Sequence, residues 1–481
     1  MNSSYLIKNA TVVSIDPTIG IQENCDVFIH NGTIEAVQQG IKAPEGVDVI
    51  DGSNCIVSPG FVDTHRHTWQ TQLRTVCCDH VLTDYVLAIR NKYGSCYTAR
   101  DAYLGNYGGA LESIDNGITF LIDHSHIMNS PEHADAAVNG LKDSKIRGVF
   151  CYGLFKNPPW NGSTLDYEKE VNTPNWRFDD ARRVRDVHFK SNEPHDVLRF
   201  GFAPAELERC TYEEAIQEIE HGRSLGSAVI TGHIAMGKYD TKHHLVRHFN
   251  EKQILKNDLL FSHGASLASD ELDAIHASGA AISVTPDTEM QMGMGHPVAF
   301  KARDHGCTAS LGVDIVSNNP ADMFQQMRLV LQAQRHLENE AQDKPLSQVA
   351  RRCYDVLEMA TQGGATAVGL GEIIGSITPG KRADLLITKC DSLRLSGVPD
   401  PVAAIVMYAN GSDIDTVFID GVVVKSGGRL TGVDMPKVLK DLRDSAEGIM
   451  ERSKRAPVHE VEAAAAALMR GEQYGGVKYS I

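Results

Sequence analysis

The stretch Pro59-Gly-Phe-Val-Asp-Thr-His-Arg-His67 decides how the rest of the chain is interpreted. Residues 56–62 are largely apolar, which is typical of a short buried strand. The strand ends in His65 and His67, whose side chains point to one face because strand side chains alternate. Two imidazoles on one face can bind one cation, and imidazole is a common zinc ligand. A histidine pair that is only hydrogen-bonded or exposed is the alternative.

Strand-like runs alternate with longer helical patterns from Phe61 onward. Counting the run that ends at His65, the sequence predicts eight buried strands separated by helices, which favours a closed (β/α)8 barrel of the TIM type. A doubly wound open sheet is the alternative, but no glycine-rich dinucleotide turn follows the first strand. The other seven predicted strands are residues 117–123, 146–154, 198–203, 228–231, 259–262, 280–284 and 307–312.

The two ends of the chain have β character of a different kind. Residues 5–57 form short alternating runs, and Asn31-Gly32 is a strong hairpin signal. Residues 375–387 and 417–425 return to β patterns. We therefore predict a discontinuous β-sandwich from residues 1–58 and 373–432, around a barrel of residues 59–372. Residues 433–481 are predicted to be a helical tail, either peripheral or in contact with another subunit, so we expect a homo-oligomer.

The composition excludes several classes of protein. The 481 residues are 42% hydrophobic and 22% charged, as in ordinary globular proteins. A formal charge of −16 argues against a nucleic-acid or anionic-membrane surface and says nothing positive about the substrate, which we expect to be a small molecule from the resemblance described below. The ten cysteines have no CxxC spacing and indicate reduced thiols. We find no signal peptide or membrane span, so we expect a cytoplasmic protein.

Polar side chains collect where the predicted strands end, which is the functional face of such a barrel. One histidine at a strand end is usually structural. Histidines at three strand ends and an aspartate at a fourth are hard to assign to packing alone. The residues are His65 and His67 after strand 1, Asp123, His124 and His126 at strand 2, Glu206 after strand 4, His233 at strand 5, His263 at strand 6 and Asp314 after strand 8.

Two motifs resemble those of one enzyme family. Residues 59–67 resemble the start of the barrel in the amidohydrolase superfamily, and Gly375-Ser-Ile-Thr-Pro-Gly-Lys-Arg-Ala-Asp384 resembles the return of those chains into their β domain. The resemblance covers nearly the whole chain. It is greatest to the branch that holds chlorohydrolases and cytosine, guanine and adenosine-type deaminases.

The resemblance implies one divalent metal, expected to be Zn²⁺, with Fe²⁺ as the alternative. His65, His67, His233 and Asp314 match the metal ligands, and His263 matches the histidine that faces substrate or the attacking water. Binuclear relatives use a bridging lysine or glutamate from strand 3 or 4. No lysine is suitably placed in residues 146–155 or 198–203, so we expect a single metal.

The chain departs from this branch at strand 5. The deaminases usually carry His-x-x-Glu there, and the glutamate shuttles a proton. Here the segment is His233-Ile-Ala-Met236, and methionine cannot transfer a proton. Glu206, Glu289 and His296 are the candidates to replace that glutamate.

Roles for the remaining residues follow from this metal site. Asp314 can bind the metal and act as general base; a helix cap is its alternative role, because Ser317-Asn-Asn-Pro320 precedes a predicted helix over residues 321–337. His263 can polarise the substrate, or it can be a core histidine satisfied by the backbone. The residues that we predict to contact substrate are Trp69, Gln70, His124, Glu206 and His296.

Three functions remain open on the sequence alone. The leading hypothesis is a mononuclear metal-dependent hydrolase that attacks a carbon–nitrogen or other carbon–leaving-group bond in a small, cyclic substrate. A metal-dependent lyase or cyclase of the same fold is the second, favoured by Met236. A non-catalytic metal-holding protein is the third, and the full set of ligand-type residues together with His263 argues against it.

Overall fold

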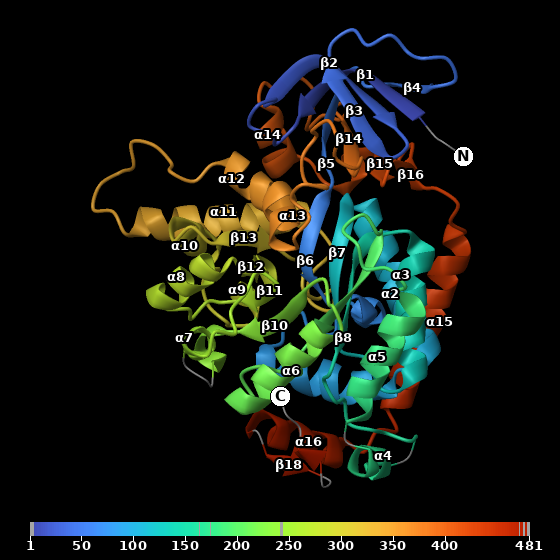
Figure 1. Ribbon diagram of the computed structural model, residues 1–481, viewed down its shortest axis with the longest axis vertical. Coiled ribbons are helices and arrows are strands. Elements are labelled where there is room, and N and C mark those ends of the chain that lie inside the picture. The colour runs from blue at the N-terminus through green and yellow to red at the C-terminus, as the bar shows by residue number, and fades with distance from the viewer. Residues whose placement is uncertain are drawn as a thin grey trace.

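The structure is a computed structural model that describes residues 4–162, 164–173, 175–240, 244–470, 472–474 and 477–478. A parallel barrel forms the body, and a separate mixed sheet lies at one end of it (Figure 1). The fold class predicted from the sequence is confirmed. The domain boundaries themselves stay a prediction.

The barrel has eight parallel strands in sequence order, and each predicted run overlaps one of them. The two edge strands meet at their carboxyl ends, where Asp314 N donates to His65 O at 2.8 Å and His67 N donates to Asp314 O at 2.8 Å. A Cβ at Gly312 would lie 2.8 Å from the backbone N and O of His65, so glycine permits this approach. The strands are β6 (Phe61–Arg66), β7 (Ile118–Ser125), β8 (Arg147–Gly153), β9 (Leu198–Ala203), β10 (Ile230–Ile234), β11 (Leu259–His263), β12 (Ala281–Val284) and β13 (Thr308–Leu311).

Helices cover the outside of the barrel. Two of the longer ones begin with capping boxes, Thr98 with Asp101 and Thr211 with Glu214. The α-helices of this body are α1 (Leu82–Tyr85), α2 (Ala99–Asp115), α3 (Pro131–Ser144), α4 (Glu168–Asn172), α5 (Trp176–His188), α6 (Tyr212–Ser224), α7 (Leu245–Glu251), α8 (Ser269–Ser278), α9 (Pro286–Gln291), α10 (Ala299–Asp304), α11 (Met323–Glu340), α12 (Cys353–Glu358), α13 (Gly364–Ala367) and α14 (Pro401–Ala403). Shorter 3-10 and π turns are η1 (Thr68–Leu73), η2 (Val86–Tyr93), η3 (Gly94–Cys96), η4 (Gly237–Tyr239), η5 (Met359–Gly363), η6 (Ala404–Tyr408) and η7 (Gly411–Asp413).

The mixed sheet combines both ends of the chain. Its central pairing is antiparallel, with Cys55 opposite Lys389 and Pro59 opposite Leu385. The predicted hairpin is present, with Asn31-Gly32 joining β2 to β3. In a second hairpin, Asp420-Gly421 joins β15 to β16. All four of these residues have positive φ, as tight hairpin turns require. The strands are β1 (Ser4–Val13), β2 (Ile21–His30), β3 (Thr33–Gln38), β4 (Asp48–Asp51), β5 (Cys55–Pro59), β14 (Leu385–Lys389), β15 (Ile414–Ile419), β16 (Val422–Ser426) and β17 (Arg429–Leu430).

A buried ion pair fastens this sheet to the barrel. Arg147, at the start of β8, is fully buried and donates from Nε and Nη2 to Asp384 at 2.8 and 3.2 Å. It also donates from Nη2 to Asp420 at 2.6 Å. These contacts give a physical reason for Asp384 at the end of the second motif.

We expect Arg147→Met to destabilise the protein strongly, because it leaves the buried Asp384 without its cation. Loss of one partner of a buried pair typically costs about 3–5 kcal/mol of the free energy of unfolding. Urea denaturation followed by circular dichroism measures the change. Arg247→Met is the matched control, since the Arg247–Asp270 pair lies at the surface; an equally small shift in both variants would contradict the prediction.

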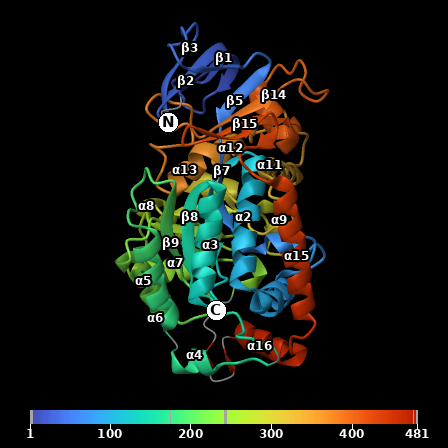
Figure 2. The same ribbon diagram turned by 90° about the vertical axis from the view of Figure 1, so that its right-hand side faces the viewer.

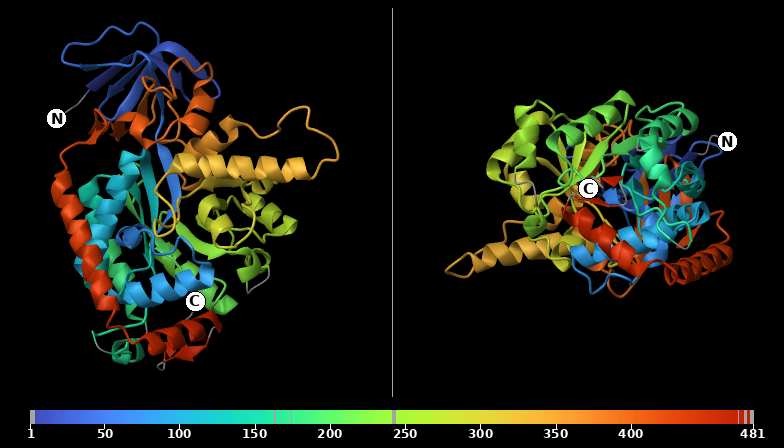
Figure 3. Two further views of the ribbon diagram at one scale, coloured as in Figure 1. Left: turned by 180° about the vertical axis from the view of Figure 1, so that it is seen from behind. Right: turned by 90° about the horizontal axis from the view of Figure 1, so that it is seen from below.

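The tail is helical, as predicted, and packs along the barrel. It consists of α15 (Met435–Ser453) and α16 (Val458–Arg470), followed by the short strands β18 (Gln473–Tyr474) and β19 (Val477–Lys478). The first of these helices runs beside α2, and the second contacts η2 at the end of the barrel far from the mixed sheet (Figure 2). From below, the red C-terminal segment lies across this end (Figure 3, right).

Within the described ranges, no helix combines the length and the hydropathy needed to cross a membrane. All ten cysteines are free thiols, as their spacing predicted.

Candidate metal centre

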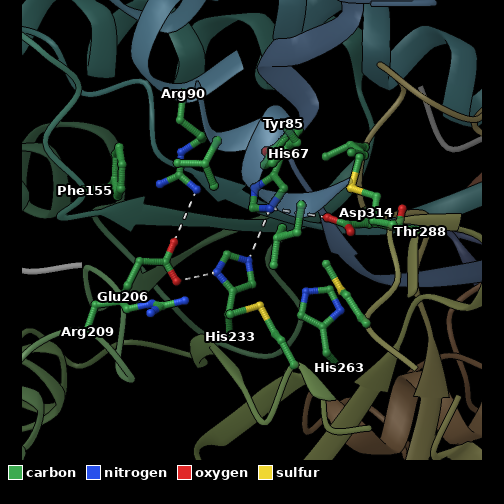
Figure 4. A pocket seen from close by; sticks show the side chains of 16 residues that line it. His67, Tyr85, Arg90, Phe155, Glu206, Arg209, His233, His263, Thr288 and Asp314 are labelled. Carbon is green, nitrogen blue, oxygen red and sulfur yellow. Dashed lines mark hydrogen bonds and ion pairs between the residues drawn. The ribbon is translucent and has the colours of Figure 1, made fainter. Parts of the chain in front are cut away.

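Four ligand-type atoms converge at the carboxyl ends of the barrel strands, and Figure 4 shows three of the residues that bear them, His67, His233 and Asp314. Nε2 of His65 and of His67 lie 3.3 and 3.4 Å from Asp314 Oδ1, and Nε2 of His233 lies 3.3 Å from that of His67. Zinc–nitrogen distances of about 2.0–2.1 Å place the ligands of a tetrahedral ion about 3.3–3.4 Å apart. These three spacings are compatible with one metal ion. His65, His67 and His233 fall in one group of ligand atoms within 4.8 Å of one another, and His65 and Asp314 fall in a second with His263.

The other nitrogen of each imidazole has a partner that fixes the ring. Nδ1 of His67 donates to His124 O at 2.7 Å, and Nδ1 of His233 donates to the Glu206 carboxylate at 2.9 Å. Nδ1 of His65 lies 2.8 Å from Ser262 Oγ. These contacts direct the three Nε2 lone pairs inward, as in other metal sites. Nε2 of the buried His65 lies 3.3 Å from Asp314 Oδ1, a contact that one cation shared by the two groups would account for.

The electrostatics leave the ligands in the protonation states that a metal needs. Burial lowers the pKa of His65 to about 4, against the opposing effect of Asp314. Burial and then the neighbouring His65 hold the pKa of His67 well below its ordinary value. Burial alone would raise the pKa of Asp314, but the hydrogen bond and charge of His65 lower it. Near neutral pH His65 and His67 are thus neutral imidazoles and Asp314 is an ionised carboxylate.

His263 faces this cluster from the end of β11. Its Nδ1 lies 3.1 Å from Thr285 Oγ1 and 3.4 Å from Glu289 Oε1. Burial lowers the pKa of His263, but the hydrogen bond to Glu289 and the charge of Asp314 raise it above its ordinary value. Both His263 and Asp314 have left-handed backbone conformations, with φ of 78° and 68°. Such conformations are uncommon outside glycine and cluster at functional sites.

Glu206 supports a metal ligand and is unsuited to donate protons. Its carboxylate accepts from His233 Nδ1 and, at 3.2 Å, from Arg90 Nη1. Burial would raise the pKa of Glu206, but the His233 and Arg90 contacts lower it to about 2. Glu206 is therefore ionised at neutral pH, which removes it from the candidates that could deliver a proton in place of the strand-5 glutamate.

Asp314 does not cap helix α11, the alternative role that the sequence allowed. Helix α11 begins at Met323, and its cap is Asp322, which accepts from Gln325 N at 3.2 Å.

Three of the residues predicted to contact substrate lie behind the pocket wall. Trp69 is fully buried and donates to His126 Nδ1 at 2.9 Å, and Gln70 donates to the Tyr85 hydroxyl at 2.7 Å. His124 stacks on the His233 ring, with centroids 4.6 Å apart. His124 also belongs to a group of four histidines, with His65, His67 and His233, whose ligand atoms lie within 4.8 Å of one another.

The structure does not place His296, which was predicted to contact substrate, in the pocket. This histidine is exposed, its Nε2 lies 3.0 Å from Gln334 Oε1, and it does not line the pocket. Gly293 and Gly295, with φ of 78° and 128°, turn the chain so that Met294 is buried and His296 points to the surface. Neither a substrate contact nor proton transfer by His296 is supported.

A pocket of about 50 Å³ lies in front of the cluster. Asp314 and His263 line it, together with an apolar wall of Met236, Met292 and Met294. Lining residues that the sequence patterns did not indicate include Tyr85, Arg90, Phe155 and Arg209. They come from short helical segments and loops without a recognisable motif; the only signal was an arginine within the apolar run Val86-Leu-Ala-Ile-Arg90.

Sequence comparisons agree with the site. The Amidohydrolase family model matches residues 56–424. The chain is 27% identical over 462 residues to a 5'-deoxyadenosine deaminase of Methanosarcina barkeri, covering 94% of this chain and 99% of that protein. It is 26% identical to a 5-methylthioadenosine/S-adenosylhomocysteine deaminase of Pyrococcus furiosus, covering 90% and 98%.

Solved structures share the fold. An adenosine deaminase from Xanthomonas campestris with bound zinc superposes with a TM-score of 0.80 at 19% identity, covering 93% of this chain and 99% of that one. Atrazine chlorohydrolase from Arthrobacter aurescens TC1, complexed with zinc, gives 0.75 at 20% identity, covering 92% and 100%. The chain belongs to the amidohydrolase family and is a metal-dependent hydrolase that acts on carbon–nitrogen bonds.

Proposed function

We propose that the chain is a mononuclear enzyme in which His65, His67, His233 and Asp314 hold one divalent cation, zinc or else iron. The observation that carries this proposal is the set of ligand separations of 3.3–3.4 Å at the mouth of a pocket. A cation bound there supplies an activated water at neutral pH.

The protein's own groups do the remaining work. Asp314 takes a proton from the attacking water and passes it to the leaving group, as a general base and then a general acid. His263 donates a hydrogen bond to the ring nitrogen or carbonyl oxygen that gains electron density when water adds. Glu206 holds His233 in the ligating tautomer. Water adds to carbon, the carbon–nitrogen bond breaks, and the amine leaves protonated.

The substrate is a small cyclic compound that bears an amine or another leaving group. The deaminases of 5'-deoxyadenosine and of 5-methylthioadenosine among the relatives support a nitrogen heterocycle. Met236 lines the pocket where the deaminase branch has its glutamate. The absence of a carboxyl group at this position favours substrates with a carbonyl or an activated ring carbon, because their reaction needs less proton donation by a general acid.

A lyase or cyclase is the second candidate function. Methionine at position 236 cannot transfer a proton, so Asp314 and His263 are the groups that can do so near the reacting carbon. Turnover in ¹⁸O-labelled water separates the two, since only hydrolysis incorporates the label.

We expect about one zinc ion per chain on elemental analysis, and loss of turnover on exhaustive chelation with recovery when zinc or iron is restored. His67→Ala is expected to lose the metal, since it removes one of four ligands. His296→Ala is the matched control, an exposed histidine outside the pocket, and should keep both metal and turnover. Full activity after chelation, with no metal detected, would overturn the proposal.

Assembly and location are proposals of the same kind. We infer a homo-oligomer in the cytoplasm, supported by the packed helical tail and the ten free thiols. Light scattering of the purified protein tests the first, and a monomer at micromolar concentration contradicts it. Fractionation of the source cells tests the second; recovery of the chain outside the cytoplasmic fraction contradicts it.

A further inference from the structure

Arg90 is a buried cation in the pocket wall. It belongs to η2, and its side chain is only 4% exposed. The guanidinium lies over the ring of Phe155, 3.5 Å from its centroid, and Nη1 donates to Glu206 at 3.2 Å (Figure 4). Stacking on one side and a hydrogen bond on another fix the plane of the guanidinium.

The remaining edge of this guanidinium has no protein partner. Nε and Nη2 of Arg90 are both shielded from solvent and make no hydrogen bond with any described residue. Leaving buried donors of a charged group unsatisfied is costly, so proteins rarely do so without a reason. A second donor is unsatisfied nearby: His126 Nδ1 accepts from Trp69, so the neutral ring carries its proton on Nε2, which also lacks a partner.

Other arginines of this chain bind carboxylates through the same Nε–Nη2 edge. Three other arginines bind one carboxylate side-on through Nε and Nη2, the fork that matches the two oxygens of a carboxylate. The pairs are Arg147 with Asp384 at 2.8 and 3.2 Å, Arg223 with Asp258 at 2.7 and 2.9 Å, and Arg247 with Asp270 at 2.6 and 2.9 Å.

We propose that the Nε–Nη2 edge of Arg90 binds a carboxylate of the substrate, so that the enzyme acts on ring compounds that carry a carboxylate. This inference rests on the proposed function, because the ring to be hydrolysed occupies the same pocket. A ligand that reaches the edge displaces the side chains that now shield it.

The charges around the pocket agree with an anionic ligand. Arg90 and Arg209 both line it, and the described carboxylates that line it are Glu206 and Asp314. Asp314 faces the metal ligands, and Glu206 is shared between His233 and Arg90. This end of the pocket therefore holds two guanidinium groups against one carboxylate, which favours an incoming negative charge.

The geometry places the carboxylate close to the chemistry. A single side chain, Glu206, connects Arg90 to the metal ligand His233 through contacts of 3.2 and 2.9 Å.

Isonicotinate and isonicotinamide test this, because they share shape and ring nitrogen and differ in the carboxylate. Their para geometry prevents chelation of the metal by both groups. In calorimetric titrations of zinc-loaded protein, we expect isonicotinate to bind about tenfold or more tightly, as charge-assisted bidentate pairs do. The ratio should fall to about two or less in Arg90→Gln and be intermediate in Arg90→Lys, which keeps the charge but not the fork.

The ratio separates recognition from a structural role, because a misplaced Glu206 or a damaged fold weakens both probes alike. Arg247→Gln is the matched control, an exposed arginine that uses the same edge, and should leave the ratio unchanged. A ratio near one in wild-type protein that holds zinc, or a ratio that persists in Arg90→Gln, overturns the inference. Missing zinc, or no metal-dependent turnover of any ring substrate, would instead count against the proposed function.

Discussion

Asp314→Asn is expected to lower kcat by about 100- to 10,000-fold, the usual contribution of a positioned general base. The amide has nearly the same volume, but it cannot take up a proton at neutral pH. The fold should persist, because asparagine tolerates the left-handed conformation found at Asp314, and the two backbone hydrogen bonds to β6 do not involve the side chain. Steady-state kinetics, together with metal content and circular dichroism, measure the effect.

Asp322→Asn is the control for the alternative structural role. Asp322 caps α11, and asparagine is also a good cap, so both stability and turnover should stay near those of the wild type. If Asp314→Asn is folded, holds its metal and is nearly as fast as wild type, Asp314 is not the general base.

Met236→Glu is expected to raise the rate of ammonia release from cytosine- or adenosine-type substrates by up to about 100- to 10,000-fold, the value of positioned acid–base help. The wild-type protein should be slow with these substrates and faster with cyclic amides or activated rings. Met236 is 8% exposed and lines the pocket, so a glutamate there is largely desolvated. Desolvation and the nearby Asp314 raise the pKa of such a carboxyl, as a proton donor requires.

Met294→Glu provides the matched control, because Met294 also lines the pocket but does not follow His233 in the strand-5 segment. Equal gains in both variants would mean that any added carboxylate helps. Rapid ammonia release by the wild type would show that another group already transfers the proton. Glu289→Gln then tests the buried Glu289 beside His263, whose Oε2 has no partner among the described residues.

The sequence predicted the architecture well because periodic signals are local. Each barrel strand is a buried apolar run, and the β2–β3 and β15–β16 turns contain an Asn-Gly and an Asp-Gly pair with positive φ. The pairing of β5 with β14 depends on contacts between the two ends of the chain. The β patterns at both chain ends indicated a shared domain in advance, and the resemblance of both motifs to one family agreed with it.

The candidate metal ligands could be predicted from the sequence because they lie at strand ends. The pocket-lining residues of the connecting segments could not. His65, His67, His233 and Asp314 lie together because the barrel gathers strand ends. Arg90 reaches the pocket from η2, whose place is set by packing against α16, more than 360 residues later in the chain. The exposure of His296 depends on two glycine conformations that the sequence does not specify.

The union of both chain ends in one sheet constrains how the protein is made. The partner of β5 begins at Leu385, so about 325 residues must be synthesised before β5 is paired on that side. At about 5–20 residues per second, the ribosome leaves this edge open for on the order of 20–60 s. During that time the nascent N-terminal strands present unpaired backbone groups to other chains. Once the C-terminal strands are complete, they pair with this edge of β5. This pairing finishes the fold and also removes the exposed edge at which other chains could aggregate.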